Sequence, residues 1–225
     1  MDDIMGKIGI LWYMKKNTEK IFPERLYHIY NRGINGENLF KEERNYPYFL
    51  DKYMKFVLPV AHLYAYCLMK NHFHFFIEIK TEEEIRDYFE GKVKNQQDIP
   101  IESLISRAFN SFFKSYSVTI NKTYSRTGRL FEEPFLRIEV ESNRQITNLI
   151  TYIHHNPQKH SFVNKFDEYP YSSYQDHLDD SPAWLARKQV LNWFGTKEEY
   201  KRAHADIEDL PPSQTTSLQE LMLLD

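Results

Sequence analysis

The chain has 225 residues, of which 41% are hydrophobic and 16% aromatic, enough to bury the core of one domain of moderate size. No run of about 18 apolar residues occurs, which excludes a membrane-spanning helix. No small-residue cleavage pattern follows the apolar patch at residues 8–12, so we expect no signal peptide. The single cysteine, Cys67, cannot form an internal disulfide, and this predicts a protein of the reducing cytoplasm.

The net charge of −3 argues at first against a nucleic-acid-binding protein, but the charges are unevenly distributed. Residues 161–225 carry 6 basic and 12 acidic side chains, a net charge of −6. Residues 1–160 carry 23 basic and 20 acidic side chains, a net charge of +3. An acidic C-terminal segment therefore masks a mildly basic body, which permits nucleic-acid binding without establishing it.

The first half of the chain alternates between strand and helix patterns. The predicted elements are a strand at 25–33 ending at Gly33, a helix at 42–57 with Pro47 in its first turn or at its start, strands at 61–70 and 72–80, and a short helix with a loop at 81–100. The close succession of the second and third strands indicates a β-hairpin.

Two amphipathic helices dominate the second half. Apolar residues from Leu104 to Ile120 fall on one half of a helical wheel, and Gly128 follows as a stop signal. Ser142 and Gln145 form a capping box that begins a helix at 143–156, which we expect Pro157 to end. The buried stripe of this helix is predicted to be Ile146, Leu149, Ile150 and Ile153. Between the two helices, residues 129–141 predict a strand that is broken or bulged near Pro134.

This order predicts an α+β fold, a ferredoxin-like or RRM-like antiparallel sheet with helices packed on one face. A helical region at about 183–208, followed by a tail that we expect to be disordered, predicts a C-terminal helical extension. We therefore divide the chain into an N-terminal extension (1–24), a central domain (25–175) and an acidic, partly helical extension (176–225).

The stretch "LMKNHFHFFIEIK" (68–80) places two histidines one residue apart in a strand. Because side chains alternate between the faces of a strand, His72 and His74 share one face, while Phe73 and Phe75 share the apolar face beneath the helices. We expect the two imidazoles to lie on the open side of the sheet, close enough to tilt onto one divalent ion. Two ordinary surface histidines are the alternative.

"LITYIHHNPQKH" (149–160) offers a reactive group and a further ligand. Tyr152 and Asn156 lie one helical turn apart at the margin of the buried stripe. Tyr152 can act as a nucleophile, and Asn156 can offer an amide oxygen to a hard cation. His155 is an alternative third ligand. A packed tyrosine and a helix-ending asparagine remain the plainer interpretation of this pattern.

Several motifs occur in one order: "YHIYNRGINGENLF", "CLMKNHFHFFIEI", and "YIHHNPQKH" followed by "YPYSSY". This ordered set resembles the REP-associated tyrosine transposases, relatives of the single-strand transposases of bacterial insertion sequences, within the HUH endonucleases. The resemblance covers residues 25–175. Lys70 stands where the family usually has proline, a difference that concerns the turn before the histidines.

The resemblance implies a site and a reaction. His72, His74 and Asn156 would bind Mg²⁺ or Mn²⁺, and Tyr152 would attack a phosphodiester of single-stranded DNA, leaving a 5′-phosphotyrosine and a free 3′-hydroxyl. The substrate implied is single-stranded DNA beside a REP-like hairpin. The protein would act as a monomer or a homodimer without membrane association, and the C-terminal extension is assigned no role in the chemistry.

Basic side chains are the predicted contacts to the DNA backbone. They are Arg32, Arg107, Lys114, Lys122, Arg126, Arg129 and Arg137. The alternative function is a non-catalytic protein that binds single-stranded nucleic acid through exposed aromatic residues, or a domesticated DNA-binding regulator that has lost cleavage.

Overall fold

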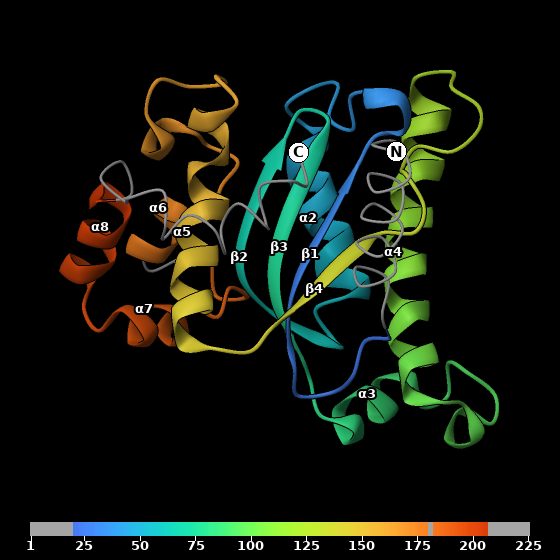
Figure 1. Ribbon diagram of the computed structural model, residues 1–225. Helices are drawn as coiled ribbons and strands as arrows, with labels where there is room; N and C mark the ends of the chain where they lie inside the picture. Colours follow the sequence, from blue (N-terminus) through green and yellow to red (C-terminus); the bar gives the residue numbers. More distant parts are fainter. Residues whose placement is uncertain (1–19, 180–181, 207–225) are drawn as a thin grey trace, which may run out of the picture.

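A four-stranded antiparallel sheet forms the centre of the protein (Figure 1). The computed structural model of the chain describes residues 20–179 and 182–206. The strands are β1 (Leu26–Arg32), β2 (Ala61–Met69), β3 (His72–Ile79) and β4 (Leu136–Val140). Their order across the sheet is β2-β3-β1-β4, so β3 lies in the interior and β4 at an edge. The predicted hairpin of the second and third strands is confirmed, since β2 pairs with β3.

Helices connect and surround these strands. They are α2 (Asn45–Phe56), α3 (Glu82–Phe89), α4 (Ile101–Thr123), α5 (Asn143–Lys159), α6 (Tyr174–Leu178), α7 (Arg187–Phe194) and α8 (Lys197–Ala205). Short 3₁₀ turns lie at Ile34–Gly36, Gln96–Asp98 and Phe166–Glu168. Within the described ranges, no helix combines the length and apolar character needed to cross a membrane.

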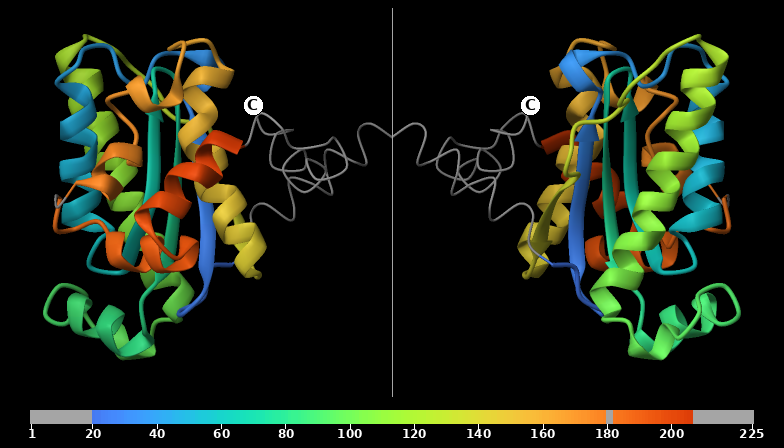
Figure 2. Two further views of the ribbon diagram at one scale, coloured as in Figure 1. Left: turned by 90° about the vertical axis from the view of Figure 1, so that its left-hand side faces the viewer. Right: turned by 90° about the vertical axis from the view of Figure 1, so that its right-hand side faces the viewer.

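The predicted α+β class is confirmed, but helices cover both faces of the sheet. Figure 2 shows α2 and α4 on one side of the strands and α5 on the other. The expectation of helices on one face and an open histidine face is therefore wrong. The apolar stripe of α5 has to be buried. It packs on the other face of the sheet, where β2 presents the small apolar side chains of Ala65 and Cys67.

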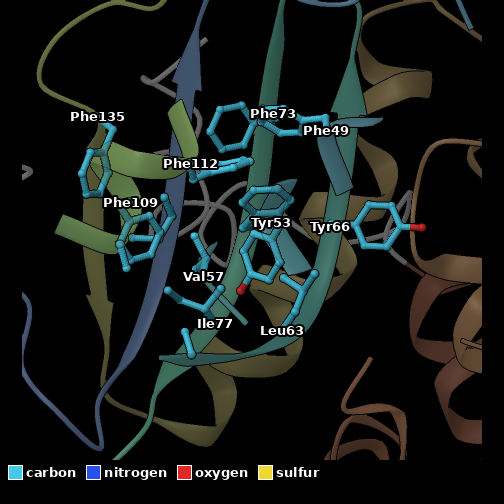
Figure 3. Close-up of a cluster of buried hydrophobic side chains, with 14 of the residues drawn as sticks. Phe49, Tyr53, Val57, Leu63, Tyr66, Phe73, Ile77, Phe109, Phe112 and Phe135 are labelled. Atoms are coloured by element: carbon cyan, nitrogen blue, oxygen red, sulfur yellow. The ribbon is translucent and has the colours of Figure 1, made fainter. Parts of the chain in front are cut away.

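The first core lies between the sheet and the helices α2 and α4. At its centre are Phe49, Tyr53, Phe73, Phe75 and Phe112. Figure 3 shows four of these, Phe49, Tyr53, Phe73 and Phe112, with neighbouring side chains. The apolar face predicted for β3 is confirmed, because Phe73, Phe75, Ile77 and Ile79 are fully buried in it. The predicted buried face of α4 is confirmed as well.

The second core lies between the sheet and α5. It contains Ala65, Cys67 and Phe76 from the sheet and the predicted stripe of Ile146, Leu149, Ile150 and Ile153 from α5. The capping box of Ser142 and Gln145 is present at the start of the helix.

Pro157 does not end α5, contrary to the sequence-based prediction, because it lies in the last turn of the helix. There the missing N–H removes only one helical hydrogen bond. The backbone N–H of His160 bonds to the carbonyl oxygen of Asn156 (2.9 Å), which closes the end of the helix.

The C-terminal extension packs onto the rest of the molecule. The single helical region expected at 183–208 is two helices, α7 and α8, separated at Gly195, whose φ of 99° a glycine adopts without strain. The N–H of Ala186 bonds to the carbonyl oxygen of Leu63 on β2 (2.9 Å). The boundary proposed after residue 175 falls inside α6, and the tail beyond residue 206 and most of the segment 1–24 lie outside the described residues.

Phe49 tests the first core, because its ring contacts aromatic rings from both α4 and β3. We expect Phe49→Ala to lower the free energy of unfolding by about 3–5 kcal/mol, since it removes a buried ring and leaves a cavity. Phe22→Ala is the matched control, because this ring is 40% exposed, and it should change stability by about 0.5 kcal/mol. Urea denaturation measures the free energy of unfolding of both variants. Equal losses of stability would contradict this account of the core.

Candidate active site

His72 and His74 lie at the end of β3 that faces α5. The antiparallel register places His72 opposite Arg32 and His74 opposite Tyr30, so all four side chains belong to the same face of the sheet. The two imidazole rings are 5.4 Å apart between centroids and nearly perpendicular. His74 is 1% exposed, so this part of the face is covered and not open.

Each of these histidines uses its Nδ1 atom in a contact with another side chain. His72 Nδ1 lies 2.8 Å from Asn71 Oδ1, and because an amide oxygen only accepts, Nδ1 carries the hydrogen and Nε2 the lone pair. His74 Nδ1 lies 2.9 Å from Nε2 of His28, a fully buried residue of β1. Sequence reasoning did not single out His28, although the motif "YHIYNRG" and a period of two would have placed it on this face.

Tyr152 of α5 packs directly on the histidines. Its ring meets that of His74 at 5.9 Å and that of His28 at 6.3 Å, both edge to face. The side chain is 3% exposed. The ammonium group of Lys159 lies 5.5 Å from the centre of the Tyr152 ring, which brings a positive charge beside the phenol. Lys159 is a second residue of the site that sequence reasoning did not assign.

Two ring contacts give the relative direction of the helix α5 and the strand β3. Tyr152 contacts His74, and eight residues later the ring of His160 lies 5.2 Å from that of His72. The two elements are therefore antiparallel, and Asn156, midway between Tyr152 and His160, belongs to the same helical face.

Asn156 is fully buried at this position. Its Nδ2 atom donates to the carbonyl oxygen of Tyr152 (3.1 Å). Its Oδ1 atom is buried without a hydrogen-bond partner in the described part of the chain. An unsatisfied buried amide oxygen is costly, and this oxygen, one helical turn after Tyr152, is the feature that fits a cation ligand.

His155 points elsewhere. Its Nε2 atom donates to the carbonyl oxygen of His204 on α8 (2.8 Å), and its ring packs against that of Phe166 at 4.0 Å between centroids. These contacts direct the side chain toward the C-terminal helices, which disfavours His155 as the third ligand relative to Asn156.

The candidate donor set consists of two imidazoles and one amide oxygen. In the described part of the chain, no three histidine, cysteine or carboxylate side chains gather in a way that could hold a metal ion. Glu78, the carboxylate on the histidine face of β3, accepts a hydrogen bond from Tyr64. A divalent cation held by His72, His74 and Asn156 would therefore take its remaining ligands from water and phosphate oxygens, which Mg²⁺ and Mn²⁺ accept.

Three of the predicted DNA contacts meet in one groove. Arg107 and Lys114 of α4 and Arg137 of β4 line a groove of about 570 Å³, together with Lys20 and Asn110. Arg137 pairs with Ile29, a residue of the first core, so the groove lies at the β4 edge on the α4 side of the sheet. The groove is therefore on the opposite face of the sheet from Tyr152.

The remaining basic candidates are not in this groove. Arg126 is held by Glu37 (2.7 Å), by Asn121 and by the carbonyl oxygen of Arg129, which gives it a structural role. Arg129 pairs with Glu133 at 3.3 Å on the surface, and Lys122 lies in the last turn of α4. Arg32 pairs with Glu132 (2.9 Å), but its strand position beside His72 places it next to the candidate site.

Comparisons with known proteins bear on the fold. No model of a known family and no curated protein sequence matches the chain. One solved structure does. It is a REP-associated tyrosine transposase bound to a REP hairpin, with a TM-score of 0.51 and 12% sequence identity over 75% of this chain and 88% of that one. At this identity the match shows a similar fold, as the resemblance implied, but not membership of the family.

A second group of histidines, His154, His177 and His204, lies between α5 and the C-terminal helices. His204 Nδ1 donates to the carbonyl oxygen of Tyr200 (2.7 Å), so its Nε2 accepts from His154 Nδ1 (2.8 Å). His154 Nε2 in turn accepts from the hydroxyl of Ser173 (2.8 Å). This chain of hydrogen bonds joins α5 to α8, and it requires neutral imidazoles.

Burial lowers the pKa values of these histidines. The pKa of His204 falls to about 3, and that of His154 lies well below its usual value. The pKa of His177, whose ring lies 5.6 Å from that of His154, also falls to about 3, mainly through burial and secondarily through the nearby His204. The unfolded chain therefore binds protons below pH 6.5 that the folded chain does not, so stability falls as the pH decreases toward 3.

The substitution His177→Leu tests this linkage. Between pH 7 and pH 5, one such histidine should lower the free energy of unfolding by about 2 kcal/mol. We expect urea denaturation of His177→Leu to show a pH dependence smaller by about this amount. His62→Leu is the control, because His62 is exposed on β2 and solvent reaches its ring in both states. Parallel curves for His177→Leu and the wild type would refute the linkage.

Proposed function

We propose that the protein is a metal-dependent endonuclease and strand transferase of single-stranded DNA, which cleaves beside a hairpin through a 5′-phosphotyrosine intermediate. The observation that carries the proposal is the packing of Tyr152 against His74 with Asn156 on the same face of α5. There the candidate nucleophile packs against one imidazole with a second imidazole beside it, and a buried amide oxygen follows one helical turn later. The resemblance of the ordered sequence motifs and the similar fold of a transposase support the same class.

His72, His74 and Asn156 would hold a Mg²⁺ or Mn²⁺ ion, which supplies positive charge to the scissile phosphate. The Tyr152 hydroxyl loses its proton and forms a bond to phosphorus. The bond between phosphorus and the 3′-oxygen breaks, and that oxygen gains a proton to become a free 3′-hydroxyl. The number of phosphoester bonds is unchanged, so attack by a 3′-hydroxyl on the phosphotyrosine reverses the step and joins strands without an external energy source.

The residues around Tyr152 suit this chemistry. The two edge-to-face contacts with His28 and His74 hold the phenol ring in one orientation, which reduces the entropy lost when the phosphate is attacked. The ammonium group of Lys159 beside the ring favours the negative charge that develops during attack. Arg32, opposite His72, is positioned to contact a neighbouring phosphate.

The groove between α4 and β4 supports a nucleic-acid partner. Its cationic side chains from Arg107, Lys114 and Arg137 form a concave basic surface suited to a phosphate backbone. The structurally similar transposase is bound to a REP hairpin. We propose that hairpin DNA is the partner of this chain also.

The substitution Tyr152→Phe tests the nucleophile. We expect wild-type protein with Mg²⁺ or Mn²⁺ to form a covalent product with a labelled library of single-stranded hairpins, and Tyr152→Phe to form none, because only the attacking oxygen is lost. Denaturing gel electrophoresis detects the product.

Tyr88→Phe is the matched control, because this tyrosine lies on α3, an element that contributes no residue to the site, and it should retain full activity. Equal product from the wild type and Tyr152→Phe would move the nucleophile to another tyrosine. Hairpin binding without product from either would favour the non-catalytic regulator.

The substitution Arg107→Gln tests the groove. Loss of one phosphate contact should weaken binding of single-stranded DNA at all sequences and reduce the slope of log affinity against log salt by about 0.7. Fluorescence anisotropy over a salt series measures the affinity and its dependence on salt. Arg126→Gln is the matched control: its guanidinium is engaged by Glu37, so it should lower stability and leave the salt slope unchanged. If both variants keep the wild-type slope, the groove does not bind the backbone.

A further inference from the structure

His28 lies at the centre of the site, where the chemistry above gives it only a contact with the Tyr152 ring. It lies in the middle of β1 and is fully buried. Its ring stacks on Tyr30 at 4.8 Å and on His74 at 5.1 Å, and it meets the edge of Tyr152 at 6.3 Å. It therefore contacts both a candidate metal ligand and the candidate nucleophile.

The contact between His28 Nε2 and His74 Nδ1, 2.9 Å long, holds a single hydrogen when both rings are neutral. If His28 donates that hydrogen, the lone pair of His74 Nδ1 is consumed and the hydrogen of His74 lies on Nε2, where it would block a cation. If His74 donates, its Nε2 lone pair is available for a ligand. Only the second arrangement is compatible with a metal at His74.

The neighbouring histidine shows the same arrangement. His72 Nδ1 donates to the amide oxygen of Asn71, which directs the lone pair of His72 to Nε2. The two rings lie 5.4 Å apart, so Nε2 lone pairs on both can serve one ion. Metal-binding histidines generally donate their other ring N–H to a fixed acceptor, which selects the tautomer and the orientation of the ring.

We propose that His28 is the positioning residue of the site: it accepts the Nδ1 hydrogen of His74, holds the Nε2 lone pair of His74 in place for the divalent cation, and supports the ring of Tyr152. This inference rests on the proposed function. The contact with His74 satisfies the Nε2 atom of His28, a fully buried polar atom that would be costly to leave unpaired.

Two substitutions separate hydrogen bonding from packing. His28→Phe keeps a ring of similar size and removes the acceptor. His28→Gln retains an amide oxygen that can accept from His74 Nδ1. Phe76→Leu is the packing control, because Phe76 lies directly opposite His28 in the β1–β3 register and is fully buried. Thermal denaturation confirms that each variant is folded.

The first readout needs no metal. The ¹⁵N shifts of the histidine rings in metal-free protein distinguish the two tautomers, and we expect the hydrogen of His74 on Nδ1 in the wild type and in His28→Gln. In His28→Phe this preference is lost. A wild-type His74 with its hydrogen on Nε2 would overturn the inference, whatever the protein does to DNA.

The second readout is the affinity of the protein alone for Mn²⁺, measured by calorimetry. We expect His28→Phe to bind Mn²⁺ about 10–100-fold more weakly than the wild type, with His28→Gln close to the wild type and Phe76→Leu less stable but unchanged in affinity. Equal affinities of the wild type and His28→Phe would refute the positioning role while leaving the proposed function intact. Failure of the wild type to bind Mn²⁺ and to form a covalent DNA product would refute the proposed function, and the tautomer would then decide separately whether His28 orients His74.

Discussion

The site depends on one packing relation, in which α5 lies on the histidine face of the sheet and runs in the opposite direction to β3. Tyr152 meets His74, and His160, just past the last residue of α5, meets His72. Asn156 is buried one helical turn after Tyr152. The chemistry that we propose depends on this packing: once α5 is packed on this face, Tyr152 on the helix is brought to His74 on the strand.

The packing of α5 is secured from its far side by the C-terminal helices. His154 on that side of α5 joins Ser173 and His204, and His155 bonds to the backbone of α8. The helices α7 and α8 share the second core with α5 through Val190 and Tyr200. An extension that contributes no ligand or nucleophile thus determines where Tyr152 stands. It also buries histidines whose neutral form the fold requires, which links the position of the tyrosine helix to pH.

The sequence predicted most of the elements, because their signals are local. Three such signals each specify an element from neighbouring residues: the alternating sides of the β3 residues, the apolar face of α4 on a helical wheel, and the capping box at Ser142. The second covered face was missed, since it depends on where α5 packs and not on any pattern within β3. The same limit applies to the site: motifs indicated His72, His74 and Tyr152, whereas His28 and Lys159 are recognised only from contacts across strands and along the folded helix. Arg126, predicted from its charge alone, is held in internal hydrogen bonds that no local pattern indicates.

The central claim is that Tyr152, and no other tyrosine, becomes linked to the 5′-phosphate of cleaved DNA. Digestion with trypsin releases residues 145–159 as one peptide, "QITNLITYIHHNPQK", in which Tyr152 is the single tyrosine. Mass spectrometry of the protein–DNA product after nuclease treatment therefore tests the claim directly. The account predicts a nucleotide adduct on this peptide, assigned to Tyr152 by fragmentation. An adduct on any other tyrosine-containing peptide, with residues 145–159 unmodified, would contradict it.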